Sequence, residues 1–189
     1  MQRRAILQCL LVGAAASPWG AAQADEALWR LLQSGGQVVL VRHALTDPGV
    51  GDPPGFRLDA CGTQRNLSDA GRADARRLGE VLRERRVPVA RVLSSPWCRC
   101  LETARLAFGR EAEVERSLGN LFGRRELEAQ QVAELRKLVR RPEGGNLFMV
   151  THGSTTYALT GESPGTGEMV VLTPQPGGGF RVAGRLPAG

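Results

Sequence analysis

The sequence predicts a doubly wound α/β domain, in which a mostly parallel sheet carries helices on both faces. Apolar, β-branched runs such as VVLV (38–41) and NLFMV (146–150) alternate with segments whose apolar residues recur every three to four positions. Strands separated by helices favour parallel pairing and right-handed crossovers. A length of 189 residues with 42% hydrophobic content is enough for one well-packed domain. Ligands of such a sheet bind beyond the carboxyl ends of its strands.

The first 24 residues are typical of a secretory signal peptide. Arg3 and Arg4 precede an apolar stretch over 5–16, and Ala-Gln-Ala at 22–24 provides small residues for cleavage. The apolar stretch is too short to span hydrocarbon, so we expect no stable membrane anchor. The folded domain should therefore cover residues 25–189 and be periplasmic or secreted after the signal peptide is removed.

The first half of this domain shows alternating elements. A helix is predicted over 25–34 and a buried strand over 37–41. A segment rich in Gly and Pro follows at 46–66, and loops of this length in small domains tend to bind ligands or act as lids. Ser68 is placed to cap the next helix, which leads to a strand at 89–93.

The second half continues the alternation. A helix is expected after residue 94, with Ser95 as its cap, Pro96 in its first position and Gly109 at its end. The remaining predicted elements are an amphipathic helix stopped by Pro142, a strand, a short helix and an edge hairpin, at 126–141, 146–152, 154–159, and 168–174 with 180–186.

The charge pattern favours small anionic partners over nucleic acid. The formal net charge is +6, and it becomes +4 if Arg3 and Arg4 leave with the signal peptide. Of the 25 basic residues only Lys137 is a lysine, and the arginines are spread along the chain. With an aromatic content of 5%, the sequence shows no basic stripe with stacking platforms, so we expect no nucleic-acid partner.

Three cysteines remain after export, and an oxidising compartment favours pairing two of them. In a helix, Cys98 and Cys100 point in different directions, so at most one of them faces Cys61. We expect one disulfide and one free thiol. The Cys-x-Cys spacing without a nearby fourth ligand is not that of a zinc site, and no metal is expected.

The two histidines of the chain suggest one site. His43 and His152 each close an apolar strand run, Arg42 precedes the first, and Arg99 lies in the first turn of a helix that follows a third strand. A neutral imidazole is a competent nucleophile, and guanidinium groups match phosphate oxygens. Phosphoryl transfer requires mainly positioning and charge stabilisation, which this set supplies without metal.

Each of these residues also has a simpler interpretation. A histidine at a strand end is often a structural hydrogen-bonding residue, and two histidines can bind a metal, although no carboxylate or cysteine stands at a recognisable ligand spacing. Arg99 could be a surface residue that bridges Glu102 or Thr103 on its own helix.

Four motifs in order resemble the histidine phosphatase superfamily, in its phosphoglycerate-mutase-like branch, and in particular its small exported phosphatases. They are LVRHALTD, RNLSDAGRADARRLG, VLSSPWCRCLETA and MVTHGS, and the resemblance extends over most of the chain after residue 24. The resemblance implies a phosphoglycerate-mutase-like fold with His43 as the phosphate-accepting nucleophile. It further implies Arg42 and Arg99 as phosphate clamps and His152 as a contact to the transferred phosphoryl group.

The sequence departs from that family pattern at two positions. Ala44 stands where glycine is commonest, and Asn120 stands where many relatives carry the glutamate that donates a proton. Asp47 beside His43 and Glu126 at the start of a later helix are alternative acids, and each is equally compatible with a solvated surface charge.

These observations predict an exported phosphoric monoester hydrolase of the histidine acid phosphatase type, which forms a phosphohistidine and needs no metal or cofactor. Its expected substrate is a small phosphorylated compound or a phosphorylated envelope glycan. A phosphoglycerate-mutase-like phosphotransferase and a non-catalytic phosphate-binding module on the same fold are the alternatives. The sequence specifies neither the natural substrate nor the oligomeric state.

Overall fold

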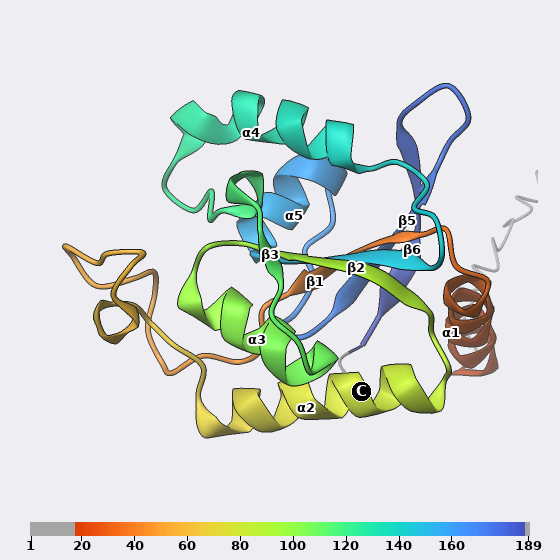
Figure 1. Ribbon diagram of the computed structural model, residues 1–189, viewed down its shortest axis with the longest axis horizontal. Helices are drawn as coiled ribbons and strands as arrows, with labels where there is room; N and C mark the ends of the chain where they lie inside the picture. The colour runs from red at the N-terminus through yellow and green to blue at the C-terminus, as the bar shows by residue number, and fades with distance from the viewer. Residues whose placement is uncertain (1–17, 188–189) are drawn as a thin grey trace, which may run out of the picture.

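The computed structural model describes residues 18–187 and contains a six-stranded sheet with helices on both faces (Figure 1). The strand order is β3-β2-β4-β1-β5-β6. The strands are β1 (Val38–Arg42), β2 (Val89–Ser94), β3 (Glu113–Val114), β4 (Asn146–Thr151), β5 (Met169–Pro174) and β6 (Phe180–Leu186). The first four strands run parallel, β5 is antiparallel to β1, and β6 is antiparallel to β5. The predicted fold class, with a mostly parallel sheet, is confirmed.

Two groups of helices cover the two faces of the sheet. One face packs against α1 (Pro18–Gln33), α2 (Asp69–Glu84) and α3 (Cys98–Phe108). The other packs against α4 (Arg125–Leu138) and α5 (Gly153–Thr160), as Figure 1 shows. Two short 3-10 turns, η1 (Cys61–Thr63) and η2 (Arg116–Leu118), lie in the connections.

Strand β1 shows why the central strands are continuously apolar. Val39 and Val41 pack into the core on the α1–α3 side, whereas Val38 and Leu40 pack into the core on the α4–α5 side. Because both faces of the strand are buried, neither can carry the polar residues of a half-exposed strand.

Helix α1 begins at Pro18, earlier than the predicted start at Asp25, and it spans the expected cleavage point after Ala24. Most of the predicted signal peptide, residues 1–17, lies outside the described residues. The signal peptide therefore stays a prediction. Between residues 18 and 187, no helix combines the length and the apolar character needed to cross a membrane.

Several predicted boundaries are confirmed. Ser68 caps α2 by accepting a hydrogen bond from the backbone N–H of Gly71 at 3.1 Å, and Gly109 ends α3 in the left-handed conformation with a φ of 65°. The α4 helix is shorter than predicted and ends at Leu138. Since a residue before proline is disfavoured in a helix, Pro142 disrupts the end of this segment before the proline itself is reached.

The predicted cap of α3 is wrong. That helix begins at Cys98, whose backbone N–H donates to the side-chain oxygen of Gln64 at 3.0 Å. Ser95 instead forms a hydrogen bond with His152, described below. The hairpin at the sheet edge forms as expected, but of its two strands only β6 lies at the edge, because β5 also pairs with β1. The two-residue strand β3 was not predicted.

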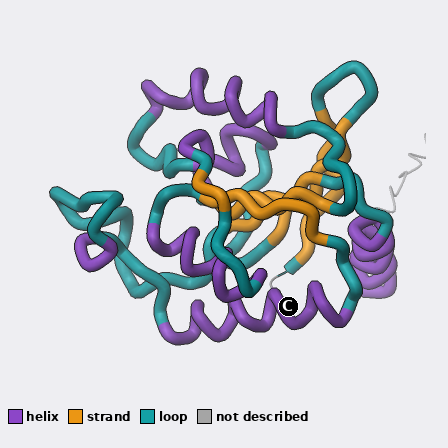
Figure 2. The backbone as a smooth tube through the Cα atoms, in the orientation of Figure 1, coloured by secondary structure: helices purple, strands orange, loops and turns teal. Residues whose placement is uncertain are grey.

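The loop over 46–66 extends away from the sheet (Figure 2) and is attached to α3 by a disulfide between Cys61 and Cys98. This confirms one disulfide and selects Cys98 over Cys100, which is a buried free thiol. At its start the loop lies against α2, where a Cβ on Gly71 would overlap the carbonyl oxygen of Leu45. A glycine at this position therefore allows α2 to support the chain just after β1.

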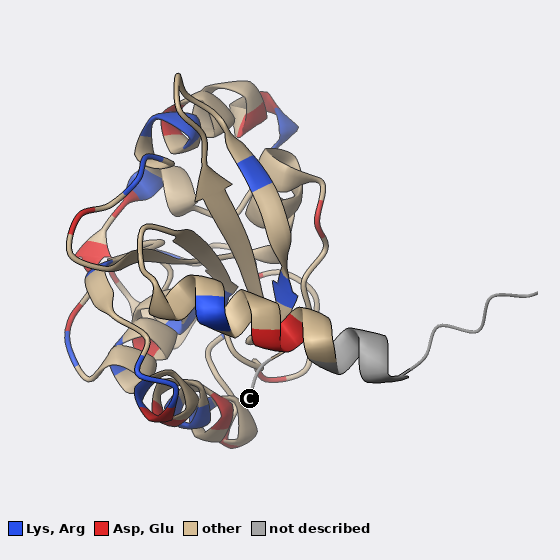
Figure 3. Ribbon diagram, turned by 90° about the vertical axis from the view of Figure 1, so that its right-hand side faces the viewer, with Lys and Arg blue, Asp and Glu red and all other residues tan. Residues whose placement is uncertain are grey.

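On the face seen in Figure 3, lysine and arginine residues are distributed over several helices and strands. They do not form a continuous basic stripe on this face.

Candidate active site

The site lies where three neighbouring parallel strands end. In the register of β1 and β4, Arg42 is paired with Thr151, so His43 and His152 leave adjacent strand ends. The backbone N–H of His43 donates to the carbonyl oxygen of Thr151 at 2.9 Å, and the two imidazole centroids are 5.4 Å apart. Strand β2 flanks β4 and leads to Arg99. The structure thus brings the four sequence-predicted residues together around one cavity of about 500 Å³.

The environment of His43 fixes its tautomer. Its Nδ1 lies 2.9 Å from the carbonyl oxygen of Ala44, and because a carbonyl oxygen only accepts, Nδ1 carries the proton. Nε2 then has a free lone pair. Burial lowers the pKa of His43 to about 3; the charges of Arg99 and Arg42 act in the same direction, and the bond to Ala44 opposes them. His43 is therefore a neutral imidazole with Nε2 available for attack.

A second hydrogen bond orients His152. Its Nε2 lies 2.8 Å from Ser95 Oγ, which itself accepts from the backbone N–H of Trp97 at 3.4 Å. The hydroxyl of Ser95 can donate to Nε2, and in that arrangement the proton of His152 is on Nδ1. Burial holds the pKa of His152 well below its ordinary value, and the charge of Arg99 lowers it further.

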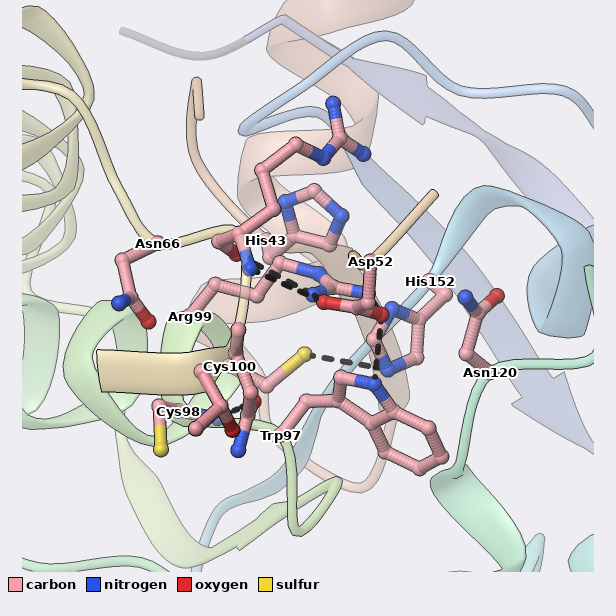
Figure 4. Close-up of polar contacts among 12 residues, drawn as sticks. His43, Asp52, Asn66, Trp97, Cys98, Arg99, Cys100, Asn120 and His152 are labelled. Atoms are coloured by element: carbon pink, nitrogen blue, oxygen red, sulfur yellow. Dashed lines mark hydrogen bonds and ion pairs between the residues drawn. The ribbon is translucent and has the colours of Figure 1, made fainter. Parts of the chain in front are cut away.

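Arg99 is buried, with an exposed fraction of 1%, and forms a two-pronged ion pair with Asp52. Its Nη1 donates to Oδ1 at 2.7 Å and its Nη2 to Oδ2 at 3.2 Å, as seen in Figure 4. Nη1 also reaches the carbonyl oxygen of Arg65. The interpretation of Arg99 as a surface residue bridging Glu102 is wrong, because Glu102 pairs with Arg72 at 2.7 Å.

Asp52, which the sequence did not point out, holds Arg99 in place. Its carboxylate also accepts from Trp97 Nε1 at 3.0 Å and from the backbone N–H of Arg65 at 3.1 Å. Burial alone would raise the pKa of Asp52, but the hydrogen bonds and charge of Arg99 outweigh it, so the pKa lies below its usual value. An ionised Asp52, itself held by Trp97 and Arg65, thus fixes the guanidinium of Arg99 through two hydrogen bonds.

Two further arginines line the cavity. Arg42 Nη1 donates to the carbonyl oxygen of Pro164 at 2.8 Å, and Arg65 Nη1 donates to that of Gly49 at 2.8 Å. Gly153 at the start of α5 lies against the guanidinium of Arg42, where an added Cβ would come within 3.4 Å of Cζ. Burial lowers the pKa of both arginines. Arg65 was missed as a site residue, although it opens the RNLS segment quoted above.

The three arginines share a feature that points to an anion. Nε of Arg42, Arg65 and Arg99 is in each case buried and has no hydrogen-bond partner within residues 18–187. Leaving buried donors unsatisfied is costly, and an oxyanion with several oxygens would satisfy them. These arginines are the charged side chains among the described residues that line the cavity, so the electrostatic potential there is positive and favours a negative ligand.

Asn120, which stands where the resemblance implies a proton-donating glutamate, lines the cavity. Its Oδ1 accepts from the backbone N–H of Phe122 at 3.1 Å and from Ser154 Oγ at 2.8 Å, so its NH₂ group is free to donate a hydrogen bond to a ligand. Asp47 and Glu126 are exposed side chains outside the cavity lining. No carboxyl group stands among the described lining residues.

The remaining candidate groups of the described residues are metal-ligating side chains and one free thiol. Within the described part of the chain, no group of three or more His, Cys, Asp or Glu side chains is arranged to hold a metal ion. The free thiol of Cys100 lies 3.5 Å from His152 Nε2, and burial raises its pKa to about 12. Cys100 is therefore a neutral thiol behind the second histidine.

A model of the histidine phosphatase superfamily (branch 1) matches residues 38–122, a range that includes Arg42, His43, Arg65, Arg99 and Asn120. No curated protein matches the sequence.

Solved structures share the fold. The protein histidine phosphatase SixA, complexed with tungstate, has 20% identity and a TM-score of 0.55, with 80% of this chain and 97% of that chain covered. A mycobacterial glucosyl-3-phosphoglycerate phosphatase complexed with VO3 has 20% identity and a TM-score of 0.58, with 77% and 96% covered. Phosphoserine phosphatase from Entamoeba histolytica, in complex with 3-phosphoglyceric acid, has 14% identity and a TM-score of 0.57, with 79% and 95% covered. At these identities the likeness concerns the fold.

Proposed function

We propose that this chain, which belongs to the histidine phosphatase superfamily, is a phosphomonoesterase that acts through a phosphohistidine at His43. The observation that carries the proposal is the pairing of a neutral His43, with Nε2 free, with three guanidinium groups whose buried Nε atoms have no partner in residues 18–187. Structural neighbours named as phosphatases support the same reaction class.

In the first step, the phosphoryl group of the ester lies between the arginines, and His43 Nε2 attacks phosphorus. The bond between phosphorus and the ester oxygen breaks as the Nε2–P bond forms, and the alcohol or phenol oxygen leaves with the electron pair. Arg42, Arg99 and His152 stabilise the charge on the equatorial oxygens. The bond from Nδ1 of His43 to Ala44 keeps the ring aligned as it becomes cationic.

In the second step, water attacks the phosphohistidine, the Nε2–P bond breaks, and inorganic phosphate leaves. The arginines supply the positive charge that both steps need, so the proposed mechanism uses neither a metal ion nor a cofactor. Asn120 can donate a hydrogen bond to the departing oxygen but cannot transfer a proton to it as a carboxylic acid does. The leaving group therefore departs with little protonation.

Export to the periplasm or outside the cell forms part of the proposal. The Cys61–Cys98 disulfide suits an oxidising compartment, and the first 24 residues have the pattern of a signal peptide. Cell fractionation, together with N-terminal sequencing of the exported protein, tests this. A chain that begins at Asp25 in the periplasm is expected, and an unprocessed cytoplasmic chain would contradict export.

Phosphate release from phenyl phosphate by the purified protein tests the activity. We expect turnover that persists in the presence of a chelator, is inhibited by vanadate and is lost in His43→Ala. A non-catalytic phosphate-binding module would bind phosphate without turnover, and a phosphotransferase would pass the phosphoryl group to a sugar-phosphate acceptor faster than to water. Activity lost in chelator and restored by a divalent metal would contradict the mechanism.

A further inference from the structure

The mouth of the active-site cavity carries apolar side chains that the proposed phosphoryl chemistry does not use. Val50, Phe122 and Tyr157 line the cavity with exposed fractions of 87%, 61% and 59%. We refer to these three residues as the apolar rim. They come from three separate segments: the loop after β1, the turn that follows η2, and the second turn of α5.

The clustering of these side chains is informative, whereas a single exposed hydrophobic residue is not. The described residues include seven large hydrophobic side chains that are exposed, and three of them surround this one cavity. Apolar groups gathered around a polar site mark a surface that binds an apolar part of a ligand.

The position of the rim indicates which part of the substrate it meets. The charged groups of the cavity are Arg42, Arg65 and Arg99, whose Nε atoms have no partner in residues 18–187, and the proposed mechanism assigns these groups to the phosphoryl oxygens. Asn120 lies close to Phe122, whose backbone N–H donates a hydrogen bond to Asn120 Oδ1. The rim therefore borders the side of the site where the family pattern places the proton donor, which is the side of the leaving oxygen.

An aromatic leaving group fits both the apolar rim and a described cavity lining without a carboxyl group. Two of the three rim side chains are aromatic, and aromatic pairs gain from stacked or edge-to-face contact beyond the burial of area. The described cavity lining has no carboxyl group to protonate a leaving oxygen, and a phenolate leaves more readily than an alkoxide. An aryl leaving group can thus contact the aromatic side chains of the apolar rim, and it departs without a carboxyl group to protonate it.

We propose that the apolar rim binds the leaving group and that the natural substrates are aryl phosphate monoesters. This inference rests on the proposed phosphomonoesterase activity. The aryl group is supplied either by a small phenolic ester or by a phosphotyrosine side chain of a peptide, which present the same ring and the same ester bond.

Phosphonates separate recognition by the rim from leaving-group chemistry, because their C–P bond is not cleaved. We expect benzylphosphonate to inhibit the wild-type protein about tenfold more strongly than methylphosphonate, which corresponds to about 1.4 kcal/mol. The double variant Phe122→Ser/Tyr157→Ser should reduce this ratio to near one. Val114→Ser is the matched control, because Val114 is 59% exposed but lies in β3, outside the cavity lining, and the ratio should not change.

Inhibition by inorganic phosphate should be equal in all three proteins, which shows that the variants are folded and that the clamp is intact. Equal inhibition of the wild-type protein by benzylphosphonate and methylphosphonate would overturn the inference while leaving the phosphatase proposal in place. Cyclohexylmethylphosphonate binding as tightly as benzylphosphonate would overturn the aromatic assignment. Absence of turnover with every ester would instead refute the phosphatase proposal.

A comparison of kcat/KM for phenyl phosphate and a phosphotyrosine peptide distinguishes the two sources. A higher value for the peptide supports a protein substrate, and a higher value for phenyl phosphate supports a small phenolic ester. Glycerol 2-phosphate turned over with a higher kcat/KM than both would overturn the proposal.

Discussion

The Cys61–Cys98 disulfide should contribute a large part of the stability of this domain. The bond joins residues 37 apart, one in the loop after β1 and the other at the first position of α3, next to Arg99. The perturbation is the double substitution Cys61→Ser/Cys98→Ser, which opens the loop and leaves the buried thiol of Cys100 in place. Loss of the bond releases both the loop and the start of the helix that carries the clamp.

The magnitude follows from the length of the closed loop. For a separation of 37 residues, the chain-entropy relation gives a loss of about 4 kcal/mol in the free energy of unfolding. Domains of this size are stable by about 5–15 kcal/mol, so the variant should retain a free energy of unfolding of about 1–11 kcal/mol. With a urea m-value of about 2 kcal/mol/M, the unfolding midpoint should fall by about 2 M.

Urea unfolding monitored by the fluorescence of the buried Trp29 and Trp97 measures this shift. Reduction should lower the midpoint of the wild-type protein to that of the double variant and should leave the variant unchanged. The pairing should not exchange with Cys100, because a thiol with a pKa of about 12 forms little thiolate. Peptide mapping without reduction that finds Cys61 and Cys98 as free thiols, or a midpoint insensitive to reduction, would refute the reasoning.

Three more predictions concern the site. Asp52→Asn should lower the free energy of unfolding by about 3–5 kcal/mol, because it leaves the buried charge of Arg99 uncompensated; a urea midpoint equal to that of the wild-type protein would contradict this. Because the pKa of His43 is lowered to about 3 in the folded state, only the unfolded state takes up this proton as the pH falls from about 6.5 to 3, so stability should decrease over that range. Urea titrations should show a weaker decrease in His43→Asn, and an equal slope would refute the assignment. Aryl esters should form phosphoenzyme about 10²–10⁴ times faster than alkyl esters, and Asn120→Glu should accelerate only the alkyl esters; stopped-flow rates that are equal for both classes would reveal a hidden acid.

The features that the sequence predicted depend on local pattern and on general topology. The apolar run over 38–41 identifies β1 because that strand is buried on both faces. His43 and His152 could be placed together because carboxyl ends of parallel strands share one edge of the sheet. The left-handed Gly109 and the capping Ser68 are local signals, and both were predicted.

The features that were missed depend on how distant segments meet. Asp52 and Arg65 come from an irregular loop whose path is set by the disulfide and by the hydrogen bond to Trp97, and no periodic pattern records that path. Ser95 has the local appearance of a helix cap, but a bond to His152, 57 residues away, determines its role. The choice of Cys98 over its neighbour likewise depends on where α3 begins.

Trapping of the covalent intermediate tests the central claim most directly. The protein is mixed with a radiolabelled aryl phosphate, quenched in base within milliseconds, digested and mapped by mass spectrometry. We predict acid-labile, base-stable label on His43, absent from His43→Ala, and formed about 10²–10³ times more slowly in Arg99→Ala, which lacks one preorganised charge. Label on another residue, or label that persists in His43→Ala, would contradict the assignment of His43 as the nucleophile.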